Sequence, residues 1–410
     1  MTISSTRYGA VRRLASSPLG PYVQPYITQL QEQGYHPISI RTHLRHMVNL
    51  NRWLTQTGRD LNDLNQAVLD RFWRHPLRVR KRLRKAPAGQ VLLTLLRKAR
   101  VTPPCGDISR TPAQHLALRY RRYLVEERGL SDWTVDGYGR HIQRFVTYQF
   151  GAGAAPPSQI RARDVLEYVL RNARTHTPQQ TKNVVTAVRS FLRFLHYQGL
   201  IRTDLASVVP AVAHWRMTGL PKHLPAEAVH QVLDRCDQTT PDGQRDYAIL
   251  LLLARLGLRA GEVVALQLED VDWDNAQITI RSKKGRGWAR MPLPTEVGKA
   301  LARYLRHGRP ACTCRHVFVR SVAPHVGFTP SGYISYLTRR ALLKAGVKSV
   351  RTGAHVFRHG LATAMLHQGA SLDEIGQVLR HQDPNTTAIY AKVDIDALRR
   401  LAVPWPGGGR

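Results

Sequence analysis

The feature that most constrains this chain is an almost wholly apolar run at residues 247–256, in which only Arg255 is charged. A helix that is apolar on every side has to be surrounded by other parts of the chain. The run is too short to cross a membrane, which takes about 20 residues, so it predicts the central helix of a folded core. A Gly-Leu-Arg-Ala-Gly-Glu sequence (257–262) interrupts it before apolar residues resume at 263–268. Arg259 is therefore expected to point from a helix end toward a cleft.

A small sheet is expected after this helix. Residues 277–281 and 289–293 alternate apolar and polar side chains, which is typical of paired strands. The turn between them carries several cations, and residues 317–319 are a candidate third strand. Helices are expected from Pro225 onward and at residues 332–345, 355–367, 371–380, 386–391 and 394–401. The predicted fold class is mainly α, with a small β-sheet in an α+β C-terminal domain.

The first 200 residues are predicted to be almost wholly helical and to contain an internal echo. The pattern of residues 30–53 returns at 124–148, at an offset of about 95 residues. Each copy is expected to form two helices joined by a turn that contains glycine. A connector with several prolines (201–224) follows. The predicted domains are an N-terminal helical domain with a basic run (1–105), a second helical domain (106–205), a linker (206–224), the C-terminal domain (225–403) and a tail (404–410).

The charge balance indicates a polyanionic partner. The chain has 61 Lys and Arg against 28 Asp and Glu, a net charge of +33. Nucleic acid is the simplest partner for such a chain, although a solvated face or linker would also explain its densest basic run. Several cations are candidates for contacts with a DNA backbone: Arg74, Arg78, Arg80, Lys81 and Arg82 in that run, Arg189 and Arg193 on a predicted helix, and Lys283 and Arg286 in the cationic turn.

Other compositional features exclude several classes of protein. No apolar run reaches about 18 residues and the N-terminus lacks a signal-peptide core, so we expect no membrane partner. The four cysteines suggest a reducing compartment, and we expect a cytoplasmic, nucleoid-associated protein. Cys312 and Cys314, with His307 and His316 nearby, are spaced poorly for structural zinc, so a loop is preferred. No metal or cofactor is expected.

Residues near the C-terminus have the chemistry to break a phosphodiester without a metal. That reaction needs cations around the phosphate, a nucleophile in line and an acid for the leaving oxygen. The chain contains His-Val-Phe-Arg-His at 355–359, Leu-Arg-His at 379–381 and Thr-Thr-Ala-Ile-Tyr at 386–390. His355 and Arg358 share a helix face at a spacing of three residues. Singly these residues are unremarkable, and the hypothesis rests on their order and spacing together.

This combination resembles the tyrosine recombinase (phage integrase) family. The matching motifs are Gly257-Leu258-Arg259-x-x-Glu262, Lys284-Gly285 followed by Pro292-Leu293, His355-x-x-Arg358-His359, Leu379-x-His381 and Tyr390. The likeness covers about residues 225–400, and the helical region 112–200 is similar to the core-binding, SAM-like domain of the family. It implies a multi-domain, C-shaped DNA clamp of helical N-terminal domains plus a tyrosine recombinase catalytic domain.

The resemblance implies six catalytic residues and one supporting residue: Arg259, Lys284, His355, Arg358, His381 and Tyr390, with Glu262 in support. Tyr390 would attack the scissile phosphate and form a 3′-phosphotyrosine link, which frees a 5′-hydroxyl. The two arginines would clamp the phosphate. Because the covalent link stores the energy of the broken bond, neither metal nor ATP would be needed.

The resemblance also implies roles for the remaining groups. Lys284 would protonate the leaving 5′-oxygen, and Lys283 is the alternative for that role. His355 would assist proton transfer from the tyrosine, whose ordinary pKa is near 10. His381 would hydrogen-bond the phosphate, and Glu262 would orient the site.

The expected activity is site-specific DNA recombination, as in integration, excision or transposition of a mobile element. The family implies double-stranded DNA as partner, a homodimer on one site, a homotetramer at a Holliday junction and, in some cases, sister recombinase chains. The alternatives are a nicking-closing enzyme of the type IB topoisomerase kind and a non-catalytic or partner-dependent DNA-binding protein of this fold. The chain departs from the family at Arg380, where glycine is usual. The last predicted helix (394–401) would dock on a neighbouring protomer or pack on its own domain.

Overall fold

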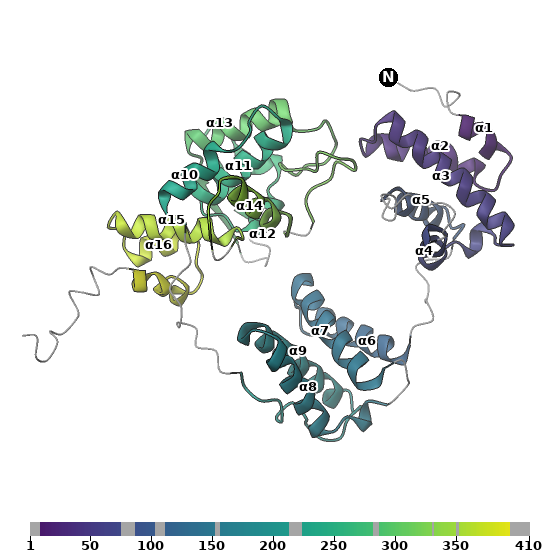
Figure 1. Cartoon of the computed structure of the whole chain (residues 1–410), viewed down its shortest axis with the longest axis horizontal. Coiled ribbons are helices and arrows are strands. Elements are labelled where there is room, and N and C mark those ends of the chain that lie inside the picture. Colours follow the sequence, from purple (N-terminus) through teal and green to yellow (C-terminus); the bar gives the residue numbers. More distant parts are fainter. Residues whose placement is uncertain are drawn as a thin grey trace, which may run out of the picture. The chain divides into compact units, whose positions relative to one another are not determined.

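The computed structural model describes residues 9–74, 87–102, 111–151, 156–212, 224–281, 287–329, 332–349 and 352–393. Two compact units are present: Gly106–Thr218 is one, and Met1–Cys105 together with Gly219–Arg410 is the other. The described residues are mostly helical and contain one three-stranded sheet (Figure 1). This confirms the predicted fold class of a mainly α protein with a small sheet. Within these ranges no helix is both long and apolar enough to span a membrane.

The N-terminal region forms a helical bundle around its own core. Its elements are α1 (Gly9–Ala15), α2 (Gly20–Glu32), α3 (Pro37–Gln56), η2 (Leu61–Asp63), α4 (Gln66–Arg74) and α5 (Pro87–Lys98). Pro37 occupies the first turn of α3, where its missing N–H is not needed. Apolar residues at helical spacing, including Leu30, Leu44 and Leu50, form the buried interior.

The second unit is a four-helix domain in the part of the chain that the structure describes. It comprises α6 (Pro112–Glu126), α7 (Asp132–Phe150), η4 (Pro157–Gln159), α8 (Ala162–Thr175) and α9 (Pro178–Tyr197). Thr111 and Thr177 begin α6 and α9 with reciprocal hydrogen bonds to a glutamine three residues on. Tyr120, Phe145 and Phe191 lie in the core, with ring centroids 5.1 Å apart for the Tyr120–Phe191 pair.

The C-terminal region places helices around the predicted central helix. Its elements are α10 (Ala226–Asp234), α11 (Pro241–Arg255), α12 (Ala260–Ala265), η5 (Leu268–Asp270), β1 (Val271–Asp272), β2 (Gln277–Arg281), β3 (Trp288–Pro292), α13 (Thr295–Arg303), η6 (Tyr304–Gly308), α14 (Gly332–Lys344), α15 (His355–His367), α16 (Leu372–Val378), η7 (Pro384–Thr386) and η8 (Ala388–Val393). The side chains of Ala248 through Leu253 are all 0 % exposed, so α11 is the core helix that its composition predicted. Burying each leucine contributes roughly 1.5–3 kcal/mol.

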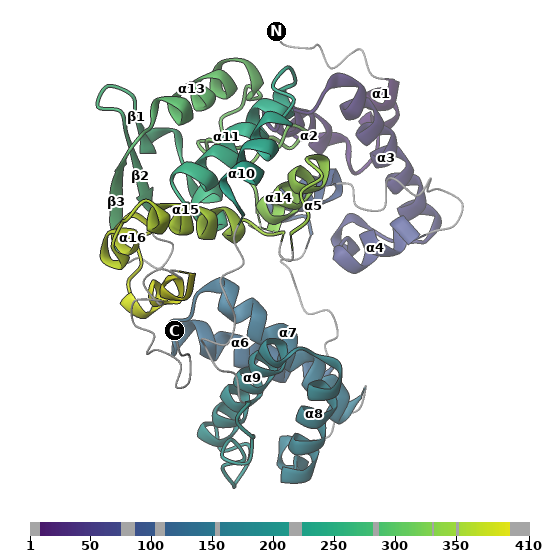
Figure 2. The same cartoon turned by 60° about the vertical axis from the view of Figure 1, so that its left-hand side comes forward.

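The sheet is antiparallel in the order β1-β2-β3, and it lies at one side of these helices (Figure 2). The hairpin pairs Ile278 with Met291 and Arg281 with Trp288. The prediction of a third strand at 317–319 was wrong. Residues 317 and 318 are buried in the core, and Val319 makes only an isolated bridge to Gly327. The helix predicted at 394–401 and the tail lie outside the described residues, and the predicted domain boundaries stay predictions.

Candidate active site

Arg259 lies where the chain leaves the central helix. Gly257, two residues earlier, has φ +56°, a conformation that glycine adopts without the clash of a Cβ. A Cβ there would also come within 2.8 Å of the Leu379 side chain, so space as well as backbone geometry favours glycine. Leu258 is buried, and Arg259 becomes the N-cap residue of α12 with its side chain 40 % exposed. The turn thus brings the guanidinium out of the core, as predicted.

Glu262 holds Arg259 from the first turn of α12. Its Oε1 accepts from Nη1 of Arg259 at 2.7 Å, and its Oε2 accepts from the Arg259 backbone N–H at 2.9 Å. Burial raises the pKa of Glu262, but hydrogen bonds from Arg259 and the nearby charge of Arg380 outweigh burial, so the net pKa is lowered. The carboxylate is therefore charged at neutral pH and fixes one face of the Arg259 side chain.

Arg358 is buried beneath this pair. Its Nη1 donates to the carbonyl oxygen of Gly257 at 2.5 Å, and its Nη2 donates to the carbonyl oxygen of Leu379. Burial, followed by the charges of Arg259 and Arg380, lowers the pKa of Arg358 to about 9. The guanidinium is still protonated at pH 7. Arg358 thus ties α15 to the two segments that precede Arg259 and Arg380, and positive charge exceeds negative charge in this cluster.

Tyr390 lies on η8 with 1 % of its surface exposed. Its hydroxyl is 2.8 Å from Nδ1 of His359, and the two ring centroids are 5.7 Å apart. Burial raises the pKa of Tyr390 to about 12, although the charge of Arg358 acts to lower it. The candidate nucleophile is therefore a neutral phenol that is hydrogen-bonded to a histidine.

The histidine that touches Tyr390 is not the one that the sequence singled out. His355 begins α15, is exposed and has its ring centroid 6.5 Å from that of His359. His359 follows one helical turn later and adjoins Arg358. His355 was expected to serve Tyr390 because it has the three-residue spacing to Arg358. The four-residue spacing from His355 to His359 places both imidazoles on one face of the helix, but it does not indicate which of them meets Tyr390.

His381 and Arg380 follow α16 directly. The Nδ1 of His381 is 2.7 Å from Oγ1 of Thr387, which is itself buried. Burial and then the charges of Arg358 and Arg259 lower the pKa of His381 to about 4, so the ring is neutral at pH 7. The Nη2 of Arg380 donates to Oε2 of Glu262 at 3.1 Å. Three arginines, one glutamate, two histidines and the tyrosine thus converge from α12, α15, the end of α16 and η8.

The comparisons with known proteins point to one family. Residues 222–396 match the phage integrase family, and residues 118–199 match the N-terminal SAM-like domain of phage integrases. The y4rA protein of Sinorhizobium fredii, assigned to the integrases/recombinases, is 40 % identical over 401 residues, which cover 97 % of each chain. This chain belongs to the phage integrase family of tyrosine recombinases.

Other relatives agree with that membership. The tyrosine recombinase XerD of Listeria monocytogenes is 29 % identical over 279 residues, 67 % of this chain and 92 % of XerD. The crystal structure of the XerH site-specific recombinase bound to palindromic difH substrate has a TM-score of 0.58 at 17 % identity, covering 74 % of this chain and 99 % of that chain. The likeness to XerH is one of fold. The protein is thus a tyrosine-type site-specific recombinase.

The structure describes some of the recombinase's other predicted site residues, and others lie outside the described ranges. Arg189 donates to the carbonyl oxygen of Val209 at 2.8 Å, so it ties α9 to the segment that follows, whereas Arg193 is exposed. Arg74 ends α4, and its side chain lies outside the described residues. Other predicted residues lie outside the described residues with backbone and side chain alike: Arg78, Arg80, Lys81, Arg82, Lys283, Lys284 and Arg286. Their roles stay predictions.

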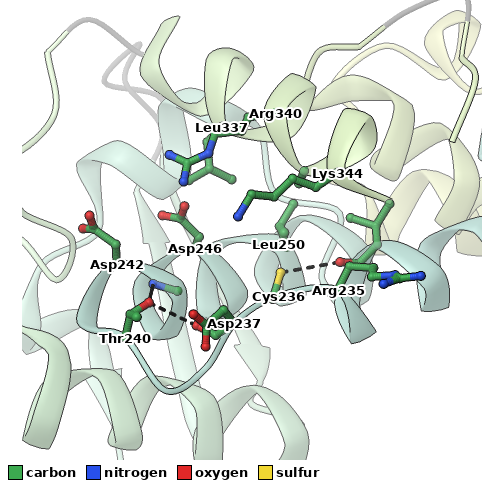
Figure 3. Close-up of a pocket in the computed structure, with 13 residues that line it drawn as sticks. Arg235, Cys236, Asp237, Thr240, Asp242, Asp246, Leu250, Leu337, Arg340 and Lys344 are labelled. Atoms are coloured by element: carbon green, nitrogen blue, oxygen red, sulfur yellow. Dashed lines mark hydrogen bonds between the residues drawn. The ribbon is translucent and has the colours of Figure 1, made fainter. Parts of the chain in front are cut away.

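Away from these residues, a cavity of ≈ 300 Å³ lies between α10, α11 and α14 (Figure 3). The catalytic candidates do not line it. Burial raises the pKa of the Cys236 thiol to about 11, so the thiol is protonated at neutral pH, and Asp246 accepts from Arg245 at 2.7 Å.

Cys314 lies elsewhere, with its Sγ 3.4 Å from Nδ1 of His316. In the described ranges no three His, Cys, Asp or Glu side chains gather as metal ligands.

Proposed function

We propose that this recombinase cleaves and rejoins DNA of a mobile element through a covalent 3′-phosphotyrosine at Tyr390, without metal or ATP. The observation that carries the proposal is a buried tyrosine hydroxyl 2.8 Å from Nδ1 of His359, the residue next to Arg358 in an arginine cluster with an excess of positive charge. The charge of Arg358 acts to lower the pKa of Tyr390, and that of Arg259 acts to lower the pKa of Arg358. A phosphodiester would offset part of this excess of charge and bring its phosphorus to the nucleophile.

The two arginines are suited to different parts of the clamp. Arg358 is buried and held by two backbone carbonyls, so its position is fixed before DNA binds. Arg259 is more exposed, and only part of its guanidinium is occupied by Glu262. In this proposal Arg358 forms the floor of the phosphate site and Arg259 reaches the non-bridging oxygens from the solvent side.

In the covalent step, the phenolic oxygen of Tyr390 forms a bond to phosphorus and the bond from phosphorus to the 5′-oxygen breaks. The phenol proton leaves to a histidine of α15. Nδ1 of His359 is 2.8 Å from the Tyr390 hydroxyl, and His355 has this role by resemblance. The leaving 5′-oxygen takes a proton from Lys284, with Lys283 as the alternative. Because the hydroxyl of Tyr390 is buried, it must be uncovered before it reaches the phosphate.

We propose double-stranded DNA as the partner, a homodimer on one site, a homotetramer in the synapse and, in some settings, sister recombinase chains. XerH was crystallised on its difH substrate, and a lambda integrase fragment as a dimer on a core site. The net charge of +33 suits a polyanion. A C-shaped clamp with its helical domains and its catalytic domain on opposite faces of the duplex is part of this proposal.

The test is covalent trapping on DNA from the ends of the element that encodes the protein. The DNA carries a nick beside the cleavage site, and EDTA is present. We expect an SDS-resistant protein–DNA band from the wild type, no such band from Tyr390→Phe, and DNA binding by both. Tight binding without a band on any DNA from the element would contradict the proposal and favour a non-catalytic or partner-dependent DNA-binding protein. Relaxation of supercoiled DNA of any sequence would favour a nicking-closing enzyme.

A further inference from the structure

Arg380 holds a backbone conformation that its residue type rarely adopts. Its φ is +55°, in the left-handed region where a Cβ meets the following carbonyl oxygen. Glycine would adopt this conformation freely. Strained residues of this kind persist where the surrounding structure holds them, and they cluster at functional sites. The contacts of the Arg380 side chain should therefore explain why arginine occupies this position.

The side chain of Arg380 connects three elements of the catalytic region. It leaves the end of α16, and its Nη2 donates to Oε2 of Glu262 in α12 at 3.1 Å. Its Nη1 lies against Sδ of Met291 on β3. The Arg380 and Glu262 side chains are 14 % and 12 % exposed, so the pair is shielded from water and salt. Such a pair holds its geometry better than an exposed ion pair does.

This pair also holds Arg259. Glu262 divides its two oxygens between the guanidinium groups, giving Oε1 to Arg259 and Oε2 to Arg380. The Nη2 of Arg259 in turn donates to the carbonyl oxygen of Arg380 at 3.4 Å. Both the side chain and the backbone of Arg380 therefore limit where Arg259 can point.

Arg380 adds charge as well as contacts. Its guanidinium is one of the groups that lower the pKa of Arg358 and of His381. Two guanidinium groups, those of Arg259 and Arg380, pair with a single carboxylate, Glu262, and Arg358 adds a third positive charge. The Nε of Arg380 is buried and finds no acceptor in the part of the chain that the structure describes. The cluster thus carries more positive than negative charge, and Arg380 contributes one of its positive charges.

We propose that Arg380 is a positioning residue for strand cleavage. With Glu262 it holds Arg259 where that side chain meets the scissile phosphate. It need not touch the DNA, because its side chain is mostly buried and engaged by Glu262, whereas Arg259 is the exposed partner. The inference rests on the proposed function.

The experiment separates DNA affinity from the rate of cleavage. The full chain and its Arg380→Gly, Arg380→Gln and Arg380→Lys variants are compared for Kd on the nicked DNA and for covalent-complex formation at saturating DNA. We expect Arg380→Gly to relieve the backbone, to keep its melting temperature and its Kd within about threefold, and to cleave at least about tenfold more slowly. Arg380→Lys should recover part of the rate, since it keeps the charge but loses the planar fork.

Two controls sharpen the result. Arg255 pairs with Glu296 at 2.9 Å in the same region but outside the site, so Arg255→Gln should cleave as the wild type does. In a Glu262→Gln background, Arg380→Gln should cost much less than it does alone, because the two residues act on Arg259 together.

Three outcomes would overturn the proposal: wild-type cleavage by Arg380→Gly and Arg380→Gln, a weakened Kd with an unchanged saturating rate, or fully additive losses with Glu262→Gln. The second outcome would indicate that Arg380 contacts DNA directly. A wild-type chain that forms no covalent complex at all would instead contradict the proposed function, before any variant is compared.

Discussion

The helix pairs α2–α3 and α6–α7 share a backbone frame, which is two helices joined by a turn that contains glycine. Different helices pack against the two pairs. α3 begins at Pro37 and α7 at Asp132, so the two helices begin 95 residues apart, as the predicted echo requires. Gly34 and Gly129, with φ of +81° and +55°, occupy the equivalent turns. In the first pair α3 contacts α4, where the ring centroids of Trp53 and Phe72 are 5.7 Å apart. In the second, α7 packs on the long helix α9.

The comparison separates local from tertiary causes. A positive-φ glycine and apolar residues at helical spacing suffice to build each frame, because both act within a few residues. Equivalent positions then carry the same kinds of side chain: Leu50 and Phe145 are buried, and Arg45 and Arg140 are exposed. The covering helices come from dissimilar parts of the sequence: α1, α4 and α5 for the first pair, and α8 and α9 for the second. Whether the two frames also share a partner is open to experiment.

The largest expected effect comes from emptying the equivalent core positions. Phe145→Ala should destabilise the second unit by about 3–5 kcal/mol, and Leu50→Ala the N-terminal bundle by about 2–5 kcal/mol. Hydrogen–deuterium exchange on the full chain should show faster exchange only in the helical bundle that carries the change. Faster exchange in both bundles from either variant would mean that the two frames do not fold independently.

A smaller effect, of opposite sign at two nearby glycines, is expected in the second frame. Gly129→Ala should cost about 1–2 kcal/mol, because a Cβ is strained at φ +55° although no atom lies within 4 Å of it. Gly137→Ala, in the interior of α7 with equally open space, should stabilise by about 0.5–1 kcal/mol. Thermal unfolding of the full chain measures both. Equal shifts from the two would refute the argument from the turn conformation.

The frames should also differ in acid sensitivity. Burial lowers the pKa of His43 to about 4 and lowers that of His46, whereas the second frame has one such residue, His141. These histidines are neutral when folded, but the unfolded chain takes up protons below pH 6.5. Stability is therefore complete above that pH and is lost as the pH falls from 6.5 toward 4. His43→Gln should flatten this slope in melting temperature more than His141→Gln does. A slope that neither variant changes would contradict the assignment.

The smallest effect concerns DNA. Arg45 and Arg140 occupy equivalent exposed positions on α3 and α7. If both frames present the same face to a duplex, Arg45→Ala and Arg140→Ala should each weaken binding a few-fold and reduce the salt slope by about one. Gel-shift titrations at several salt concentrations measure this. Sensitivity at Arg140 alone would mean that the N-terminal bundle does not use α3 in this way.

Much of the candidate site was predicted from the order of residues together with the family resemblance. Arg259 was placed by an interruption in an apolar run, and Arg358 by its spacing to His355; both lie in the cluster. His359 was missed because its contact with Tyr390 joins residues 31 positions apart, which no local spacing encodes. The strand expected at 317–319 was an error of the same kind, since a short apolar run fits a core segment as well as a strand.

The sequence by itself determined the helices, the turns and the set of chemical groups, because helical periodicity, capping and glycine conformation depend on neighbours a few residues away. Tertiary structure alone decided which groups meet. Glu262 and Arg380 pair across a separation of 118 residues, and Arg358 reaches Gly257 across 101. Such contacts depend on which segments the core brings together and which side chains lose their water there. That burial lowers the pKa of Arg358, and it raises the pKa of Tyr390 so that the phenol stays neutral.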